Sequence, residues 1–185
     1  VKTDKPEPVW IGELAGATRG IDRGAAAQAL GRRASPAAER PLGEALGRDP
    51  YWAVRGSAAI ALAAIRTPSA RDRLIEALAA EAHPRARRVI SRALGEFVHD
   101  PVAAAALATV VERGDASYFV EAEAALALGK TRAPQAPELL RQAATRESFT
   151  DVIRQHAFRG LAEARDDSAL GLLLDGTRWG RITQG

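Results

Sequence analysis

Apolar and small residues recur along this chain at intervals of roughly 33 residues, a period typical of helical repeats. The residues just before and after each repeating leucine are all alanine or glycine, which would let neighbouring helices approach closely. The repetition therefore predicts an array of helical repeats. Five leucines are the expected structural anchors of the repeats: Leu30, Leu62, Leu94, Leu128 and Leu161.

Each anchor lies in a segment with the apolar spacing of a helix that is buried on one side. The second segment has Val54, Ala58, Leu62 and Ile65, and the fifth repeats this spacing from Ile153 to Ala164. A break follows five or six residues after each anchor, as at Ser35-Pro36 and Asp100-Pro101, where a capping side chain precedes a proline. Each repeat is therefore predicted to contain two helices.

The second helix of each repeat is expected to bury the residues 12 and 16 positions after the anchor, one helical turn apart. These residues are Leu42, Leu74, Ala106, Leu140 and Leu173, then Leu46, Leu78, Val110 and Ala144. No sustained alternating run of β-branched residues indicates a strand. The predicted fold class is all-α, a HEAT-like α-α superhelix forming a right-handed solenoid of about five helix pairs.

The repeats are expected to form one domain that follows a short linker. Residues 1–8 contain two prolines and are predicted to be a disordered entry, and residues 9–19 to be the second helix of an earlier, incomplete repeat. A single domain is predicted over residues 9–185, with repeats near 20–50, 51–84, 85–117, 118–150 and 151–180. Since the chain contains no methionine, we expect it to be a fragment of a longer protein.

Composition narrows the possible functions only modestly. The net charge of +3 is small for 26 basic and 23 acidic residues, so it indicates an ordinary solvated surface. The absence of cysteine excludes disulfides and cysteine-based metal sites and favours a reducing compartment, which we take to be the cytoplasm. No apolar run approaches the ~18 residues of a membrane span, and the N-terminus does not resemble a signal peptide.

Two groups of arginines are the candidate interaction residues. The first group lies seven residues before the anchors, at Arg23, Arg55, Arg87 and Arg154, with Glu121 interrupting the series. We expect each arginine to bond an acid or carbonyl of the preceding loop, such as Asp49 or Asp151; a stripe that binds phosphate or acidic peptide is the alternative. The second group is the densest basic cluster, Arg85, Arg88 and Arg92 with the adjacent Arg87. A solvated helix face is its simpler explanation, and a nucleic-acid or acidic-partner patch is the other.

No catalytic constellation is found. Aromatic residues gather at the starts of the first helices, at Tyr51, Trp52, Tyr118, Phe119 and Phe149, where packing between repeats is favoured over ligand binding. The three histidines (His83, His99 and His156) lie far apart in sequence and do not assemble a metal site. No nucleophile elbow or glycine-rich phosphate loop is present. We therefore expect no active site, metal, cofactor or small-molecule ligand in this chain.

The repeats resemble the short, alanine- and arginine-rich class of HEAT repeats. Four strings in order also resemble the C-terminal helical region of bacterial aminopeptidase N-like zinc metallopeptidases, the gluzincins. They are DPYWAVR at 49–55, DASYFV at 115–120, SFTDVIR at 148–154 and LLLDGTRWG at 172–180. This resemblance implies a parent enzyme with an N-terminal β-domain, a zinc-binding catalytic domain and this array behind them. The zinc motif of that family has no match here, so zinc is expected only in the parent's catalytic domain.

Three functions remain open from the sequence. The favoured hypothesis is a non-catalytic scaffold that contacts its own catalytic domain or another subunit, as the resemblance implies. The second is a free-standing HEAT-like module that binds an acidic protein or partners of the phycobilin-lyase type. The third, least favoured, is a nucleic-acid binder or HEAT-like DNA glycosylase. No membrane partner is expected.

Overall fold

The fold is made of short helices joined by tight turns. A computed structural model describes residues 5–165, 167–171 and 174, and this part of the chain contains helices and no strand. The helices are α1 (Glu7–Gly16), α2 (Gly20–Arg33), α3 (Glu39–Arg48), α4 (Trp52–Ile65), α5 (Pro68–Ala80), α6 (Pro84–Leu94), α7 (Pro101–Arg113), α8 (Tyr118–Thr131), α9 (Ala136–Ala143) and α10 (Val152–Ala164). Short 3-10 turns accompany them at η1 (Pro36–Ala38), η2 (Phe149–Asp151) and η3 (Asp167–Ala169).

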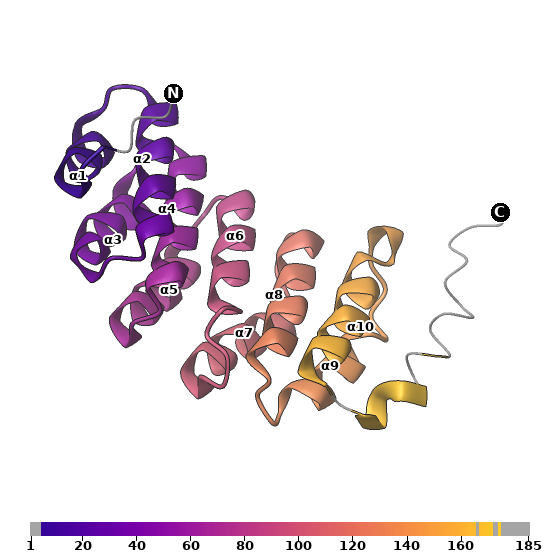
Figure 1. Ribbon diagram of the computed structural model, residues 1–185. Helices are drawn as coiled ribbons and strands as arrows, with labels where there is room; N and C mark the ends of the chain where they lie inside the picture. Colours follow the sequence, from indigo (N-terminus) through magenta and orange to yellow (C-terminus); the bar gives the residue numbers. More distant parts are fainter. Residues whose placement is uncertain (1–4, 166, 172–173, 175–185) are drawn as a thin grey trace. The chain divides into compact units, whose positions relative to one another are not determined.

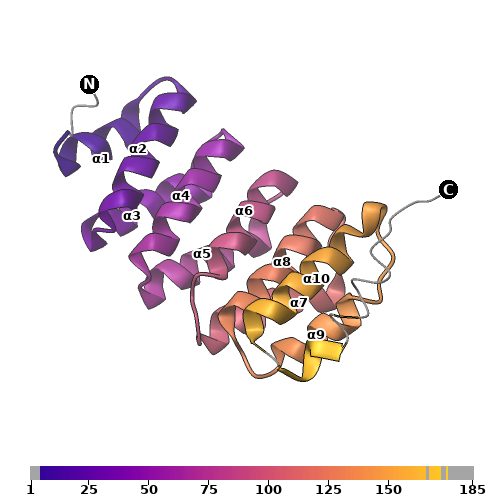
Figure 2. The same ribbon diagram turned by 45° about the vertical axis from the view of Figure 1, so that its right-hand side comes forward.

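The chain divides into two compact units, Val1–Ala93 and Leu94–Gly185. In the first unit α2 and α4 lie side by side, and α1, α3 and α5 pack against them (Figure 1). In the second unit α8 and α10 lie side by side, with α7 and α9 packed against them (Figure 2). Each unit is thus a stack of helix pairs in an all-α solenoid fold. The single domain expected over residues 9–185 stays a prediction.

Small residues on both sides of the anchors allow close contact between successive first helices. All five anchor leucines are fully buried. A Cβ on Gly31 would lie 2.9 Å from the Cα of Ala61, and a Cβ on Gly95 would lie 2.9 Å from the Cα of Ala127. The residue after one anchor therefore touches the residue before the next, which explains why neither position accommodates a large side chain.

The N-terminal helix begins earlier than the sequence predicts. Residues 7 and 8, expected to belong to the linker, form the first turn of α1, which ends at Gly16 rather than at residue 19. Pro8 is compatible with this turn because the first amides of a helix have no intrahelical partner. The first helices of the later repeats begin within about two residues of their predicted starts.

One predicted register is wrong, in the repeat anchored by Leu94. Ala106 and Val110 are only half-buried, whereas Leu107 and Val111 occupy the core positions. The cause is one additional residue in the preceding turn. The left-handed residue that ends the turn is four positions after the anchor at Ala34 and Arg66 but five after it at His99. Leu173, and the end of the repeat predicted for 151–180, lie outside the described residues.

Candidate functional site

Arg23, the first member of the predicted arginine stripe, holds two loops together. Its Nε and Nη2 atoms donate to both carboxylate oxygens of Asp49, at 2.6 and 3.0 Å. Its Nη1 donates to the carbonyl oxygens of Ala17 and Thr18, at 2.9 and 3.1 Å. The carbonyl contacts to the preceding loop agree with the sequence prediction. The carboxylate does not, because it comes from the loop that precedes the next first helix.

Arg55 repeats this arrangement one repeat later. Its guanidinium donates to both oxygens of Glu81, at 2.6 and 2.7 Å, and to the carbonyl of Asp49 at 2.8 Å. The arginine and glutamate side chains are only 16% and 6% exposed. Such paired, two-bond contacts are among the stronger protein hydrogen bonds. The first two stripe members are therefore engaged within the fold and are not open to a ligand.

Both carboxylates are further fixed by backbone amides. Asp49 accepts from the amide of Tyr51, and Glu81 accepts from the amide of His83, each at 2.8 Å. Burial alone would raise the pKa of each carboxyl, but the hydrogen bonds from the arginine and the amide outweigh it, so the pKa of both is lowered. The hydrogen bonds to these carboxylates raise the pKa of Arg23 and of Arg55. The ion pairs are thus held in their charged forms.

The arginines at two other stripe positions, Arg87 and Arg154, also bind backbone carbonyls of the preceding loop. Arg87 donates to the carbonyls of Glu81 and Ala82, at 3.1 and 2.8 Å. Arg154 is more exposed, and it donates to the carbonyl of Ala144 at 3.1 Å and to the Asp151 carboxylate at 3.4 Å. The predicted contact between Arg154 and Asp151 is therefore present, although it is longer than the pairs in the first unit.

Glu121, which interrupts the stripe in the sequence, keeps the same kind of link with the charges reversed. Its carboxylate is 7% exposed and accepts from Arg146 in the following loop. Arg146 also donates to the carbonyls of Val111 and Glu112, at the end of α7. A guanidinium thus again joins a carboxylate and backbone carbonyls. The stripe marks a structural position, at which either sign of charge can stand.

The basic cluster on α6 also makes internal contacts. Arg85 is exposed and lies over the ring of Trp52, 5.5 Å from its centroid. Trp52 in turn stacks on His83 at 5.0 Å and 9° between the ring planes. This confirms the prediction that Trp52 packs between repeats. Arg88 and Arg92 also have interaction partners. Their predicted role as an interaction surface stays a prediction.

The remaining aromatic side chains at the helix starts are half or more exposed. Tyr51 lies against Gly20, since a Cβ on that glycine would be 3.1 Å from the tyrosine ring. In the second unit Tyr118 and Phe119 are 50% and 51% exposed, and Phe149 is 70% exposed. Packing between repeats therefore accounts for Tyr51 and Trp52, whereas the other three rings lie largely at the surface.

A second series of links joins the second helices of the first unit. The hydroxyl of Ser35 donates to Glu7 at 3.0 Å, and the hydroxyl of Thr67 donates to Glu39 at 2.6 Å. Hydrogen bonds from Ser69 and Thr67 lower the pKa of Glu39. This series is not among the contacts predicted from the sequence. Its visible signals were a hydroxyl side chain before each proline and a glutamate at the start of the previous second helix.

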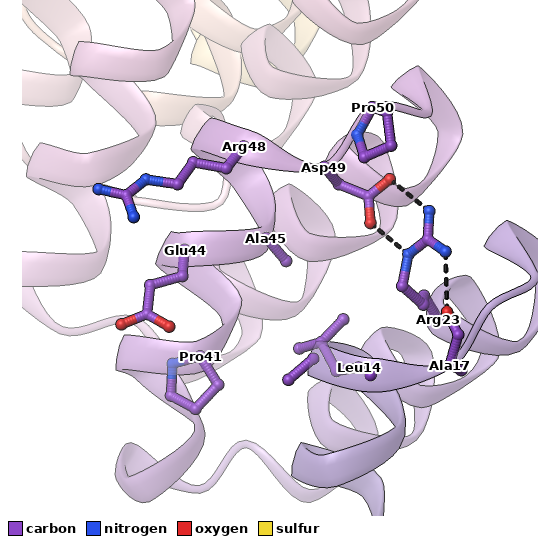
Figure 3. Close-up of a pocket in the computed structure, with 11 residues that line it drawn as sticks. Leu14, Ala17, Arg23, Pro41, Glu44, Ala45, Arg48, Asp49 and Pro50 are labelled. Atoms are coloured by element: carbon purple, nitrogen blue, oxygen red, sulfur yellow. Dashed lines mark hydrogen bonds and ion pairs between the residues drawn. The ribbon is translucent and has the colours of Figure 1, made fainter.

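The first unit also has an open pocket of about 410 Å³ beside the pair formed by Arg23 and Asp49 (Figure 3). Leu14, Ala45 and Pro50 are among its lining residues, while Figure 3 shows the side chains of Glu44 and Arg48 directed away from that pair. Of the four charged residues that line it, Arg23 and Asp49 are already paired with each other. The pocket therefore offers an open surface of mixed polarity and no pair of groups arranged for acid–base or nucleophilic chemistry.

Two other kinds of site are absent from the described part of the chain. It contains no group of three or more histidine, aspartate or glutamate side chains that could hold a metal ion. None of its helices combines the length and the apolar character needed to cross a membrane.

Comparison with known proteins agrees with the geometry. The family model for HEAT repeats matches residues 8–95 and 72–162. The chain belongs to the HEAT-repeat family. Among solved structures, human deoxyhypusine hydroxylase in complex with glycerol is similar over 86% of this chain and 73% of that protein, with a TM-score of 0.59 and 19% sequence identity. At this identity the similarity shows the fold alone. No curated protein matches the chain.

Proposed function

We propose that this HEAT-repeat chain is a non-catalytic scaffold that binds a protein partner. The observation that carries the proposal is that charged side chains at the repeated positions form ion pairs within the fold. Arg23, Arg55 and Glu121, which occupy the candidate stripe in the sequence, are engaged in links between successive loops. Such links hold neighbouring repeats in fixed positions relative to each other. A rigid binding surface requires this, whereas catalysis gives no reason for these ion pairs.

The partner proposed first is a catalytic domain of the same polypeptide, in a cytoplasmic bacterial enzyme of the aminopeptidase N-like class. The four ordered strings in the sequence support this parent. The HEAT match and the hydroxylase structure do not bear on it. In this proposal zinc belongs to the catalytic domain, and residues 1–185 contribute contacts to that domain or to another subunit.

Two measurements test the proposal. The purified chain should contain no stoichiometric zinc by atomic absorption and should not hydrolyse amino-acid p-nitroanilides. Turnover together with bound zinc would show that the chain is itself a peptidase. Separately, the region encoded upstream of Val1 should contain a His-Glu-x-x-His motif, and that region, purified alone, should bind residues 1–185 in calorimetry.

The second measurement also separates the two scaffold hypotheses. Absence of any metallopeptidase domain upstream would exclude the aminopeptidase parent and leave the free-standing binding module. An upstream peptidase domain that shows no binding to residues 1–185 at micromolar concentrations would contradict the proposed contact.

A further inference from the structure

The turns that end the first helices carry a feature that the ion-pair links do not use. Each first helix described is followed by a residue with left-handed backbone, φ between 48° and 60°. One of these residues is alanine and the other four are basic, and the one alanine directly follows Arg33. The residues are Ala34, Arg66, His99, Arg132 and Arg165.

Local stability does not explain this choice of residue. Glycine is the usual residue at a left-handed helix end because its lack of a Cβ avoids a steric penalty. This chain has glycine at none of the five positions. A cation near the last carbonyls of a helix is favourable, but a lysine or arginine within the last helical turn provides the same interaction. Basic side chains at the tips of the turns therefore indicate a role outside the helix.

In the second unit the turns lie next to one another. The amide of His99 donates to the carbonyl of Thr131, the residue before Arg132, at 2.7 Å. A Cβ on Gly129 would overlap the carbonyl oxygen of Gly160, so the C-terminal halves of α8 and α10 are in direct contact (Figure 2). His99, Arg132 and Arg165 therefore follow one another along a single edge, here called the turn edge.

The two arginines of the turn edge have no acidic partner among the residues that the structure describes. Within the described residues, neither Arg132 nor Arg165 has a hydrogen bond or ion pair from its side chain. Two neighbouring acids are engaged elsewhere. Asp100 accepts from the amides of Val102 and Ala103 at 2.9 Å each, and Glu96 lies 3.6 Å from Lys130. A third acid, Asp167, is exposed at the start of η3. Among the described residues, the edge thus offers an anion two arginines without a partner, of which Arg165 is exposed and Arg132 half-buried.

We propose that the turn edge binds an extended acidic segment of the partner protein, an assignment that rests on the scaffold function proposed above. Packed helices lie roughly 8–10 Å apart, so the tips should follow one another at about that interval. An extended chain in the polyproline II conformation has three residues per turn and advances ~3.1 Å per residue, so carboxylates at every third residue would all face the edge at about that interval.

The same spacing disfavours nucleic acid. Duplex DNA carries one charge per ~1.7 Å, far denser than this row, and His99, Arg132 and Arg165 include no large aromatic platform of the kind on which successive unpaired bases stack. Carboxylates on a polypeptide fit the edge better.

The test uses the full chain and a fluorescent peptide with glutamate at every third residue. At low salt the peptide should bind, and its glutamine counterpart should not. The double variant Arg132→Gly and Arg165→Gly should weaken binding by about tenfold, consistent with the loss of two exposed ion pairs. The control variant Arg48→Gln and Arg113→Gln, at the ends of second helices, removes the same charge and should change binding by less than about twofold.

The melting temperature separates a binding role from a structural one. Glycine relieves the left-handed strain, so Arg132→Gly with Arg165→Gly should leave the melting temperature unchanged or raised. A lowered melting temperature with unchanged peptide affinity would assign both arginines to the fold. Absence of peptide binding at low salt, equal losses in the two variants, or tighter binding of a short DNA duplex would each overturn the proposal.

Failure of the turn edge is distinguishable from failure of the scaffold function. If the double variant Arg132→Gly and Arg165→Gly binds the upstream domain as tightly as the unaltered chain does, the turn edge is not the binding surface and the scaffold function stands. If the unaltered chain does not bind that domain, the proposed contact with it is wrong, whatever the result with the peptide.

Discussion

Each of the two units has an ion pair between a first helix and the loop that follows the repeat, and the positions of the two charges are exchanged between the units. In the first unit an arginine on the first helix reaches an acid in the following loop, as Arg55 reaches Glu81. In the second unit the acid, Glu121, is on the helix and Arg146 is in the loop. In both units the guanidinium also binds backbone carbonyls from the preceding repeat. The comparison shows that this position requires a charge-matched link between loops rather than a basic surface.

The units differ as well in how closely their first helices approach. In the first unit the contact pairs Gly31 with an alanine, and a Cβ on the glycine would meet the Cα and Cβ of Ala61. The second unit has a contact of the same kind between Gly95 and Ala127, and a further one that pairs two glycines, Gly129 and Gly160, where backbone meets backbone. The second unit is therefore the more sensitive to any added side-chain atom at this position.

Breaking an ion pair of the first unit should have the largest effect. Asp49→Asn removes from Arg23 a carboxylate that is only 5% exposed, and loss of one partner of such a buried pair costs about 3 kcal/mol. Asp72→Asn removes an acid that is 56% exposed and paired with Arg71, and should cost at most about 1 kcal/mol. Urea unfolding of both variants measures the difference. Equal losses would mean that the Asp49 pair contributes no more than a surface pair.

The next largest loss of stability is expected from a substitution at the glycine contact of the second unit. Gly129→Ala should lower the free energy of unfolding by about 1–3 kcal/mol, because the new methyl group overlaps the backbone at Gly160. Gly12→Ala is the matched control, since nothing lies within 4 Å of the added Cβ. It should raise stability by about 0.5–1 kcal/mol through helix propensity. Opposite signs in urea unfolding are the expected result, and a stabilised Gly129→Ala variant would show that the helices are not in close contact.

Acid should weaken the first unit through its carboxylates. The pKa values of Asp49 and Glu81 are lowered in the folded chain, so unfolding takes up protons in acid. The stability they contribute is complete above their ordinary pKa values of 3.8 and 4.5 and decreases as the pH falls below them. Unfolding free energies measured from neutral pH to about pH 3 should therefore fall more steeply for the unaltered chain than for Asp49→Asn with Glu81→Gln. Parallel curves would contradict this linkage.

The smallest effect is expected at Arg154, which occupies the same repeat position as Arg23 but is more exposed. Its side chain is 36% exposed and its distance to Asp151 is 3.4 Å, so Arg154→Gln should cost about 0–1 kcal/mol. A loss in urea unfolding as large as that of Asp49→Asn would mean that exposure does not govern the strength of these links.

The sequence predicts the repeat unit well because the unit is defined by local spacing. The anchor leucines and their small neighbours occupy the predicted contact positions, and Trp52 packs between repeats as expected. The shift to Leu107 and Val111 could have been anticipated, since Pro101 is seven residues after its anchor and Pro36 and Pro68 are six after theirs.

The pairing of charges is harder to predict. A stripe arginine such as Arg55 has an acid or carbonyl in the loop before it and another acid in the loop after it, and sequence spacing does not decide between them. Only the packing of successive repeats brings Glu81 to Arg55 and Arg146 to Glu121. The basic turn tips were visible as a regular repetition, but their left-handed backbone, which makes the choice of residue informative, appears only in the structure.

A charge-reversal cycle at Arg55 and Glu81 measures whether this position accepts a matched ion pair of either polarity. Each single variant, Arg55→Glu and Glu81→Arg, places two like charges in a buried contact and should be strongly destabilised in urea unfolding. The double variant reproduces in the first unit the polarity of Glu121 and Arg146. We expect the double variant to recover most of the lost stability, with a coupling energy of about 2 kcal/mol or more. Additive losses in the double variant would contradict the claim that the position requires a matched pair of either sign.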